Sequence, residues 1–304
     1  MLLKEALEEY MFDCQARGLS EETVKNYGFN IKIFLRYLLE KNVEKVEEIK
    51  KTHIKQFAIY QQKQKYETSY INTNLRSIKA FIKYLHEEEY IENIIEVKEI
   101  KKDKKVIETF TDQEIREILK LLHRPKKFIE IRDKAIIYTM IDCGLRASEI
   151  IKLRHKDIKD NNTLFIQGKG KKERFVSFSA ITKKAYMKYE RTKKSYFLDK
   201  PFISDRYFLS KDGTEITRYI LQYLVKKHCK KANISRDKAF PHNFRHYFAV
   251  KSLREGLDLY SLSRIMGHSD INTTSKYTNS LRDQDIQELS LKSSPLMNLR
   301  GGDR

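Results

Sequence analysis

Cationic side chains and one tyrosine recur at fixed places in the second half of the chain. Arg146 stands in the segment GLRASEI. Roughly a hundred residues further on, PHNFRH places His242 and Arg245 three residues apart, a spacing that puts both side chains on one face of a helix. His268 follows in IMGH, and Tyr277 comes nine residues later in SKYT. The order suggests one site assembled from several segments.

These residue types suit the cleavage of a phosphodiester. Such a site must neutralise the charge that builds on the non-bridging oxygens, supply a nucleophile and protonate the leaving oxygen. Many enzymes use Mg²⁺ held by clustered carboxylates, but no carboxylate arrangement in this sequence resembles a metal cage, so we expect no metal or other cofactor. Arginine can replace the ion, because its planar fork donates two hydrogen bonds to one phosphate. Nearby cations would also favour the phenolate form of a tyrosine.

Each residue alone has an ordinary structural explanation, since a lone arginine or histidine is more often a surface or core residue. Tyr247 is a competing nucleophile among the 18 tyrosines. It lacks the Lys-Tyr-Thr context that surrounds Tyr277, which therefore remains the better candidate.

Charge patterning indicates a polyanionic partner. The chain has 61 Lys and Arg against 42 Asp and Glu, a net charge of +19, which favours nucleic acid or an acidic membrane face over a merely soluble basic protein. Residues 1–97 hold 15 basic and 16 acidic residues, yet residues 49–86 contain 8 basic residues and a single acid. The rest of the chain carries 46 basic and 26 acidic residues, so its second part should bind the polyanion more strongly.

The first part of the sequence predicts four amphipathic helices. Apolar residues at helical spacing mark residues 2–17, 20–41, a segment from about 52, and 68–86. Ser20 should cap the second helix. A basic segment without periodicity, KEIKKDKK, follows and indicates a linker. We therefore expect a helical domain over residues 1–97, a basic linker over 98–107 and a second domain over 108–304.

The second domain should be mainly helical with a small β-hairpin. Thr111 and Glu114 form a capping-box pattern that starts a helix to about residue 122. Two β-like runs at 163–167 and 174–178 flank GKGKKE. The further predicted helices span residues 127–143, 146–153, 180–193, 217–232, 242–254 and 259–266, with a short segment through 277.

Neither a disulfide framework nor a membrane span is expected. The three cysteines are widely spaced and form no CxxC pair. The N-terminal residues are acidic where a signal peptide needs an apolar run, and no apolar stretch reaches the length of a span. We expect a cytoplasmic protein.

Taken together, these segments resemble the tyrosine recombinase (phage integrase) family over nearly the whole chain. GLRASEI, HNFRH and IMGHSDINTTSKYT are similar to that family's three C-terminal signatures, in order and at similar separations. SEETVKNYGFNIKIFLRYL is similar to the opening of its core-binding domain. The resemblance implies an N-terminal helical core-binding (SAM-like) domain and a C-terminal catalytic domain that form a C-shaped clamp on DNA.

The resemblance also implies a role for each residue. Tyr277 would attack the scissile phosphate and leave a 3′-phosphotyrosine, while Arg146 and Arg245 clamp the non-bridging oxygens. His242 and His268 would hydrogen-bond the phosphate, with His242 assisting proton transfer from Tyr277. The hairpin lysine that protonates the leaving 5′ oxygen corresponds to Lys169, with Lys171 as the alternative. Glu149 should hold the helix of Arg146 in place, and His246 should support the site.

The family plan implies an Xer-like or mobile-element recombinase that acts on double-stranded DNA with inverted core sites, as a homotetramer or with a paired recombinase. A C-terminal helix through Ile286, Leu289 and Leu291 would dock on a neighbouring subunit. Two other classes stay open: a type IB topoisomerase, which shares this chemistry but relaxes supercoils, and a DNA-binding protein that does not cut.

Overall fold

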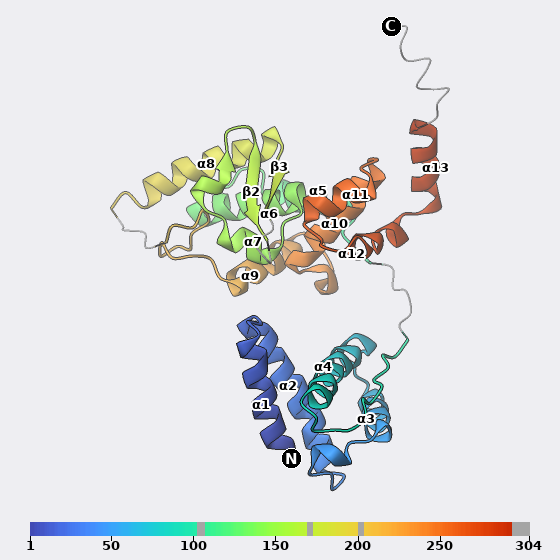
Figure 1. Cartoon of the computed structure of the whole chain (residues 1–304). Helices are drawn as coiled ribbons and strands as arrows, with labels where there is room; N and C mark the ends of the chain where they lie inside the picture. The colour runs from blue at the N-terminus through green and yellow to red at the C-terminus, as the bar shows by residue number, and fades with distance from the viewer. Residues whose placement is uncertain (102–106, 169–172, 200–203, 294–304) are drawn as a thin grey trace. The chain divides into compact units, whose positions relative to one another are not determined.

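The computed structural model describes residues 1–101, 107–168, 173–199 and 204–293. The chain divides into two compact units, residues 1–104 and 105–304 (Figure 1). Each unit has its own hydrophobic core.

The N-terminal unit contains the four helices that the sequence predicts. They are α1 (Leu3–Ala16), α2 (Glu21–Leu39), α3 (Lys51–Lys63) and α4 (Thr68–Glu87), with a short 3₁₀ turn at Val46–Glu48. The Ser20 side chain accepts a hydrogen bond from the backbone N–H of Thr23, so the predicted cap of α2 is confirmed. The apolar faces of the helices meet in a core that includes Ile31, Phe34, Leu75, Ile78 and Phe81.

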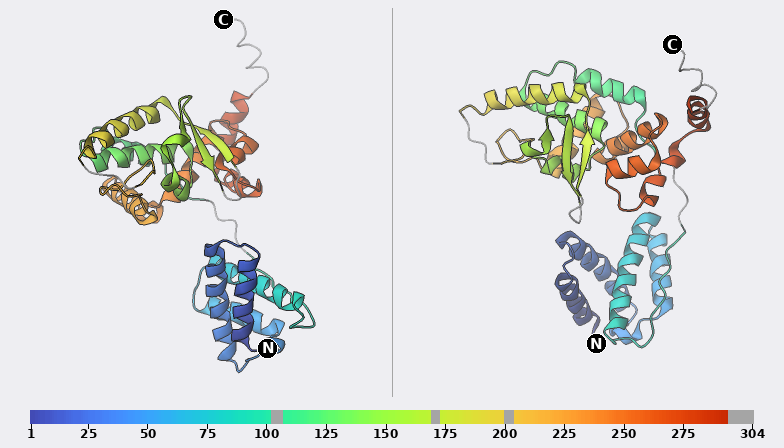
Figure 2. Two further views of the ribbon diagram at one scale, coloured as in Figure 1. Left: turned by 60° about the vertical axis from the view of Figure 1, so that its left-hand side comes forward. Right: turned by 45° about the horizontal axis from the view of Figure 1, so that its top comes forward.

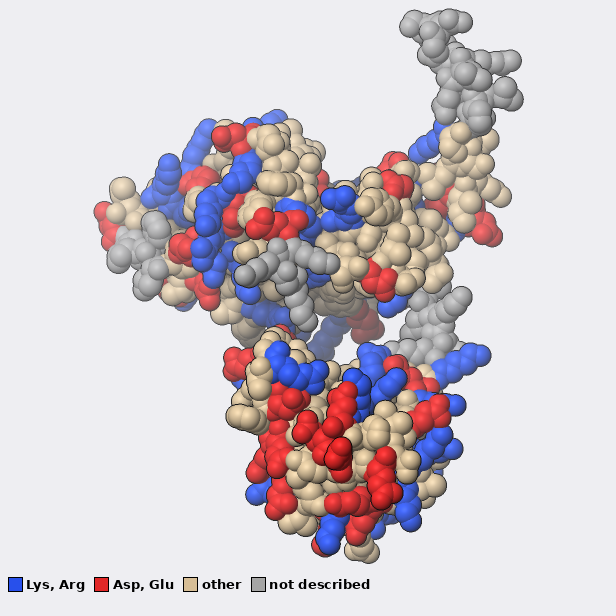
Figure 3. Space-filling model, in the orientation of Figure 1, with Lys and Arg blue, Asp and Glu red and all other residues tan. Residues whose placement is uncertain are grey.

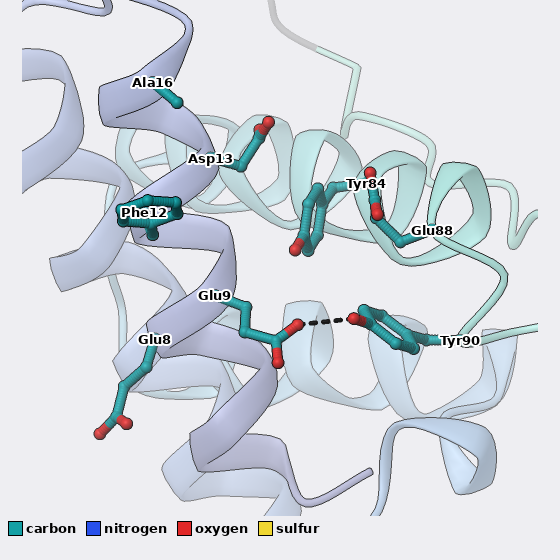
Figure 4. A pocket seen from close by; sticks show the side chains of 8 residues that line it. All are labelled: Glu8, Glu9, Phe12, Asp13, Ala16, Tyr84, Glu88 and Tyr90. Carbon is teal, nitrogen blue, oxygen red and sulfur yellow. Dashed lines mark hydrogen bonds between the residues drawn. The ribbon is translucent and has the colours of Figure 1, made fainter.

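Acidic side chains gather on one face of this unit (Figure 3). A hollow of about 470 Å³ between α1 and the end of α4 is lined by Glu8, Glu9, Phe12, Asp13, Ala16, Tyr84, Glu88 and Tyr90 (Figure 4). The hydroxyl of Tyr90 donates to Glu9 at 2.6 Å. Because four carboxylates around one hollow repel phosphate, this face is a poor surface for DNA, in contrast to the lysines of α3.

The C-terminal unit is mostly helical with a small sheet. Its helices are α5 (Asp112–Leu121), α6 (Phe128–Cys143), α7 (Ala147–Lys152), α8 (Ala180–Tyr196), α9 (Arg218–Lys231), α10 (Pro241–Arg254), α11 (Leu259–Met266), α12 (Asn272–Ser275) and α13 (Asp283–Lys292). Short 3₁₀ turns lie at His155–Asp157, Arg236–Lys238 and Thr278–Ser280. Helix α6 runs through the core and packs against α8 and α10, and the predicted capping box of Thr111 and Glu114 starts α5.

The sheet consists of β1 (Ile158–Lys159), β2 (Thr163–Gln167) and β3 (Glu173–Ser177), all antiparallel, in the order β1-β2-β3. The β2–β3 hairpin was predicted, whereas β1 was not, because two residues are too few to show a period. Leu164 pairs with Val176, and both are buried on the inner face of the sheet. Strand β3 lies next to α11, which brings the hairpin beside the segment that precedes His268 (Figure 2).

Among the described residues, no helix combines the length and apolar character needed to cross a membrane. Cys14, Cys143 and Cys229 are buried thiols in the cores of the two units.

Candidate active site

The candidate residues come from the ends of helices and from α10. Gly144 ends α6 in the left-handed conformation (φ 58°), and Arg146 is the N-cap of α7. Gly267 ends α11 in the same way (φ 65°), directly before His268. Tyr277 lies in the turn between α12 and the following 3₁₀ segment. Two glycine-terminated helices thus deliver an arginine and a histidine to the neighbourhood of α10.

Arg245 stands at the centre of this arrangement and is only 1% exposed. Its guanidinium donates to the carbonyl of Gly144 at 2.8 Å and to the carbonyl of Met266 at 2.7 Å, both at helix C-termini. Its Nε has no hydrogen-bond partner among the described residues. Burial and the charge of Arg146 lower the pKa of Arg245 to about 10, so the guanidinium stays charged at neutral pH. Arg245 is therefore a fixed, desolvated cation.

The contacts of His268 define its tautomer. Nη2 of Arg245 lies 2.9 Å from Nε2 of His268, and an arginine can only donate, so Nε2 must be the accepting nitrogen. Nδ1 then carries the proton and donates to Oγ1 of Thr274 at 2.7 Å. Burial and the charges of Arg245 and Arg146 lower the pKa of His268 to about 4. The imidazole is therefore neutral near pH 7.

Tyr277 is buried, and its hydroxyl lies 3.2 Å from Nδ1 of His246. Its ring packs in an apolar cluster with Ala249, Val250, Leu253, Leu262 and Met266. Burial raises the pKa of Tyr277, although the charges of Arg245 and Arg146 lower it in part. The side chain is therefore a phenol at neutral pH, and a nucleophilic role requires a group that accepts its proton.

The imidazole within hydrogen-bond distance of the Tyr277 hydroxyl is that of His246. His242, to which the sequence resemblance assigns the proton transfer, is not the histidine in this contact. The two imidazoles lie one turn apart on α10 with their ring centres 4.3 Å apart, and His242 is the exposed one. Burial, together with the charges of His242 and Arg245, lowers the pKa of His246 to about 4. Partial desolvation and the charges of Arg245 and Arg146 lower the pKa of His242 as well.

Glu149 holds Arg146 as the sequence predicts. Its carboxylate accepts the backbone N–H of Arg146 at 2.8 Å and Nη1 of the same residue at 2.9 Å. Nη2 of Arg146 donates to the carbonyl of Gly267 at 2.9 Å. Glu149 and the Gly267 carbonyl therefore fix the orientation of the Arg146 side chain. The side chain is still 36% exposed, so solvent or a ligand can reach it.

Arg174 is a member of this cluster that sequence reasoning did not single out. It donates to both carboxylate oxygens of Glu149 at 2.9 Å, and its Nε donates to the carbonyl of Ile265 at 2.7 Å. The sequence did contain a signal for Arg174. Residues two apart in a strand lie on the same face, so Arg174 shares the inner face of β3 with Val176. A charged residue on that face needs a buried partner.

Lys169 and its alternative Lys171 lie in the connection between β2 and β3, outside the described residues. The structure brings Arg146, Arg245, His268, His246 and Tyr277 together, with His242 beside His246. A buried cation, imidazoles and a tyrosine thus meet on a mainly helical scaffold with a small sheet, the combination expected of the tyrosine recombinase class.

Sequence comparison assigns the family. Residues 108–284, more than half of the chain, match the phage integrase family, and residues 5–92 match the phage integrase N-terminal SAM-like domain. The chain belongs to the phage integrase family, the tyrosine recombinases, which are DNA-cleaving and DNA-rejoining enzymes.

Related proteins of similar length include two from Oceanobacillus iheyensis. Tyrosine recombinase XerD is 29% identical over 283 residues, which cover 91% of this chain and 94% of the relative. Tyrosine recombinase XerC is 28% identical over 288 residues and covers 93% of each chain.

Solved structures share the fold. XerH site-specific recombinase bound to a palindromic difH substrate in a post-cleavage complex superposes with a TM-score of 0.76 at 20% identity, covering 96% of this chain and 84% of XerH. The Tn1549 transposon integrase in complex with transposon right end DNA gives a TM-score of 0.76 at 19% identity, covering 97% of this chain and all of the compared chain (100%).

Proposed function

We propose that this chain is a site-specific DNA recombinase that cleaves and rejoins DNA through a 3′-phosphotyrosine at Tyr277. The observation that carries the proposal is the placement of the Tyr277 hydroxyl beside His246, within the field of Arg245 and Arg146. We expect the reaction to need neither a metal ion nor ATP, and we expect the enzyme to be cytoplasmic.

In the cleavage step, Oη of Tyr277 forms a bond to phosphorus while the bond between phosphorus and the 5′ oxygen breaks. The phenolic proton leaves Tyr277, with His246 as the nearest acceptor and His242 next to it. The 5′ oxygen takes a proton from Lys169. A 5′-hydroxyl of another strand then reverses the step, and the energy of the phosphoester is conserved because one ester replaces another.

The cations stabilise the charge that develops on the two non-bridging oxygens. Arg146 is partly exposed and can offer its fork to the phosphate, and Nε of Arg245 has no partner in the part of the chain that the structure describes. His242 is exposed and can donate directly. His268 can donate through Nε2 only after the bond from Arg245 to that nitrogen opens and the ring changes its tautomer, so we expect DNA binding to rearrange this pair.

The proposed substrate is double-stranded DNA with inverted core sites. The net charge of +19 supports a DNA partner. The XerH complex with a palindromic site supports the inverted arrangement. Two core sites would be joined by four copies of the chain, or by two copies of this chain and two of a partner recombinase.

Trapping of a covalent complex tests the proposal. Binding to random DNA first selects a preferred duplex, which is then nicked close to the cleavage position so that the cleaved fragment diffuses away. We expect wild type and Tyr247→Phe to form a covalent DNA adduct in EDTA, and Tyr277→Phe to form none. An adduct with Tyr277→Phe, or loss of the wild-type adduct in EDTA, would refute the proposal.

The type IB topoisomerase alternative predicts a different second result. Such an enzyme relaxes supercoiled plasmid irrespective of sequence, whereas a recombinase exchanges strands between two copies of the selected site. Plasmids with two copies and with none distinguish the two activities.

A further inference from the structure

Arg174 directs its guanidinium group toward protein atoms. Its three guanidinium nitrogens all donate to protein, two to Glu149 and one to the carbonyl of Ile265. Its side chain is 10% exposed. The hydrogen bonds instead link β3, which carries Arg174, with α7, through Glu149, and with α11, through Ile265.

Glu149 is shared between two arginines. Oε1 accepts from Nη1 of Arg146 and from Nη1 of Arg174, and Oε2 accepts from the backbone N–H of Arg146 and from Nη2 of Arg174. Burial alone would raise the pKa of Glu149, but the hydrogen bonds and charge of Arg174, followed by those of Arg146, lower it. The carboxylate is therefore ionised and fully bonded.

The charges in this cluster matter for Arg146. If Glu149 were paired with Arg146 alone, its negative charge would cancel the positive charge that a phosphate must meet. With Arg174 present, two guanidiniums share one carboxylate, and the cluster keeps a net positive charge whose exposed part is Arg146.

Arg174 also packs against Gly267, at the end of α11. A Cβ at Gly267 would lie 2.8 Å from Nη1 of Arg174, so the glycine leaves room for the guanidinium as well as accepting a φ of +65°. Arg174 also binds the carbonyl of Ile265, three residues before His268. The same side chain therefore fixes the end of the helix that precedes His268.

We propose that Arg174 is a positioning residue for DNA cleavage: it takes up the charge of Glu149 so that Arg146 stays cationic toward the phosphate, and it anchors the Gly267–His268 segment. The inference rests on the proposed recombinase function and deepens it, because Arg174 acts through other residues and does not touch the substrate.

The test is a charge-balance series in the trapped-cleavage assay. The single variants are Arg174→Met and Arg174→Lys, and the double variant combines Arg174→Met with Glu149→Gln. Arg206→Met is the matched control, because Arg206 also pairs with a carboxylate and a backbone carbonyl in the same unit. Single-turnover cleavage at saturating enzyme, DNA affinity and thermal unfolding are measured for each.

We expect Arg174→Met to cleave about 100-fold more slowly than wild type, with DNA affinity within a few-fold, since an unbalanced carboxylate weakens one phosphate clamp. Removing that carboxylate in the double variant should restore cleavage by about tenfold, and Arg174→Lys should exceed Arg174→Met. A merely structural role would lower the unfolding temperature and DNA affinity together, and the second substitution would bring no rescue.

The inference fails if Arg174→Met cleaves at the wild-type rate, or if the double variant is no faster than Arg174→Met. Failure of the proposed function would be visible separately, because wild type itself would then form no adduct.

Discussion

At the scale of single residues, Arg245 is the group whose geometry is most constrained. It binds two helix-terminal carbonyls, and none of the residues that the structure describes bonds to its Nε. A lysine at 245 keeps the charge but cannot hold both carbonyls and face a phosphate at once. We expect Arg245→Lys to slow cleavage by about 100-fold to 1,000-fold. Single-turnover trapping measures this, with the exposed Arg236→Lys as control; equal rates for the two variants would contradict the assignment.

Two histidines predict a pH dependence of stability. Burial and nearby cations lower the pKa of His246 and of His268 from 6.5 to about 4. Between pH 6.5 and pH 4, these two imidazoles are therefore protonated in the unfolded chain but neutral in the folded chain. Stability is then complete above about pH 6.5 and falls as the pH drops toward 4. Urea unfolding across this range should show a declining free energy of unfolding, with a smaller decline in His246→Asn. A flat profile would mean that neither imidazole is held neutral.

Most of the site's residues could be predicted from the sequence, but their pairings could not. Arg146, His242, Arg245, His268 and Tyr277 stand in recognisable segments. The bond from Tyr277 to His246 and the bidentate pair of Arg174 with Glu149 depend on which side chains the folded segments bring together. Spacing along one chain carries no information on such contacts between segments.

At the scale of elements, Gly144 allows α6 to end in close contact with α10. It has a φ of +58°, and a Cβ there would lie 2.2 Å from the ring of Phe248. Gly256 also has a positive φ, but a Cβ there would meet only Leu289 at 3.7 Å. We expect Gly256→Ala to cost about 1 kcal/mol of backbone strain. Gly144→Ala should cost about 1–3 kcal/mol more, because the ring must move.

Chemical denaturation of the two alanine variants measures this difference. Since Gly144 immediately precedes the Arg146 segment and its carbonyl accepts from Arg245, cleavage should fall further in Gly144→Ala than in Gly256→Ala. Equal free energies of unfolding would show that the Phe248 ring yields without cost.

The elements themselves were largely predictable, because long amphipathic periods and capping residues are local signals. The four N-terminal helices and the β2–β3 hairpin lie where the sequence predicts them. Strand β1 and the 3₁₀ turns were not foreseen, since segments of two or three residues are too short to show a period. Helix α8 continues to Tyr196, three residues beyond the predicted end, because its basic residues favour helix as well as loop.

At the scale of the whole molecule, we propose that α13 docks on a neighbouring copy of the chain. Arg254 of α10 binds Asp285 at 3.1 Å, while the side chains of Ile286 and Leu291 are exposed. We predict that truncation after Asp283 leaves binding to a single core site within a few-fold and cripples recombination between two sites, because a helix that couples subunits is missing. Mobility-shift and strand-exchange assays measure the two steps. Full recombination by the truncated chain would exclude this role.

The difference in net charge between the two units follows from composition. A nearly neutral N-terminal segment and a strongly basic remainder are visible without a structure. The acid-lined hollow between α1 and α4 was not, because its carboxylates come from separate helices that converge only in the fold (Figure 4).

The central claim is that the phenolic oxygen at position 277 forms the bond to DNA. The most direct measurement is mass spectrometry of the trapped adduct after digestion with trypsin and nuclease. We expect a nucleotide joined through its 3′-phosphate to the peptide that contains Tyr277. A nucleotide on any other residue, or a 5′-linked one on Tyr277, would contradict it.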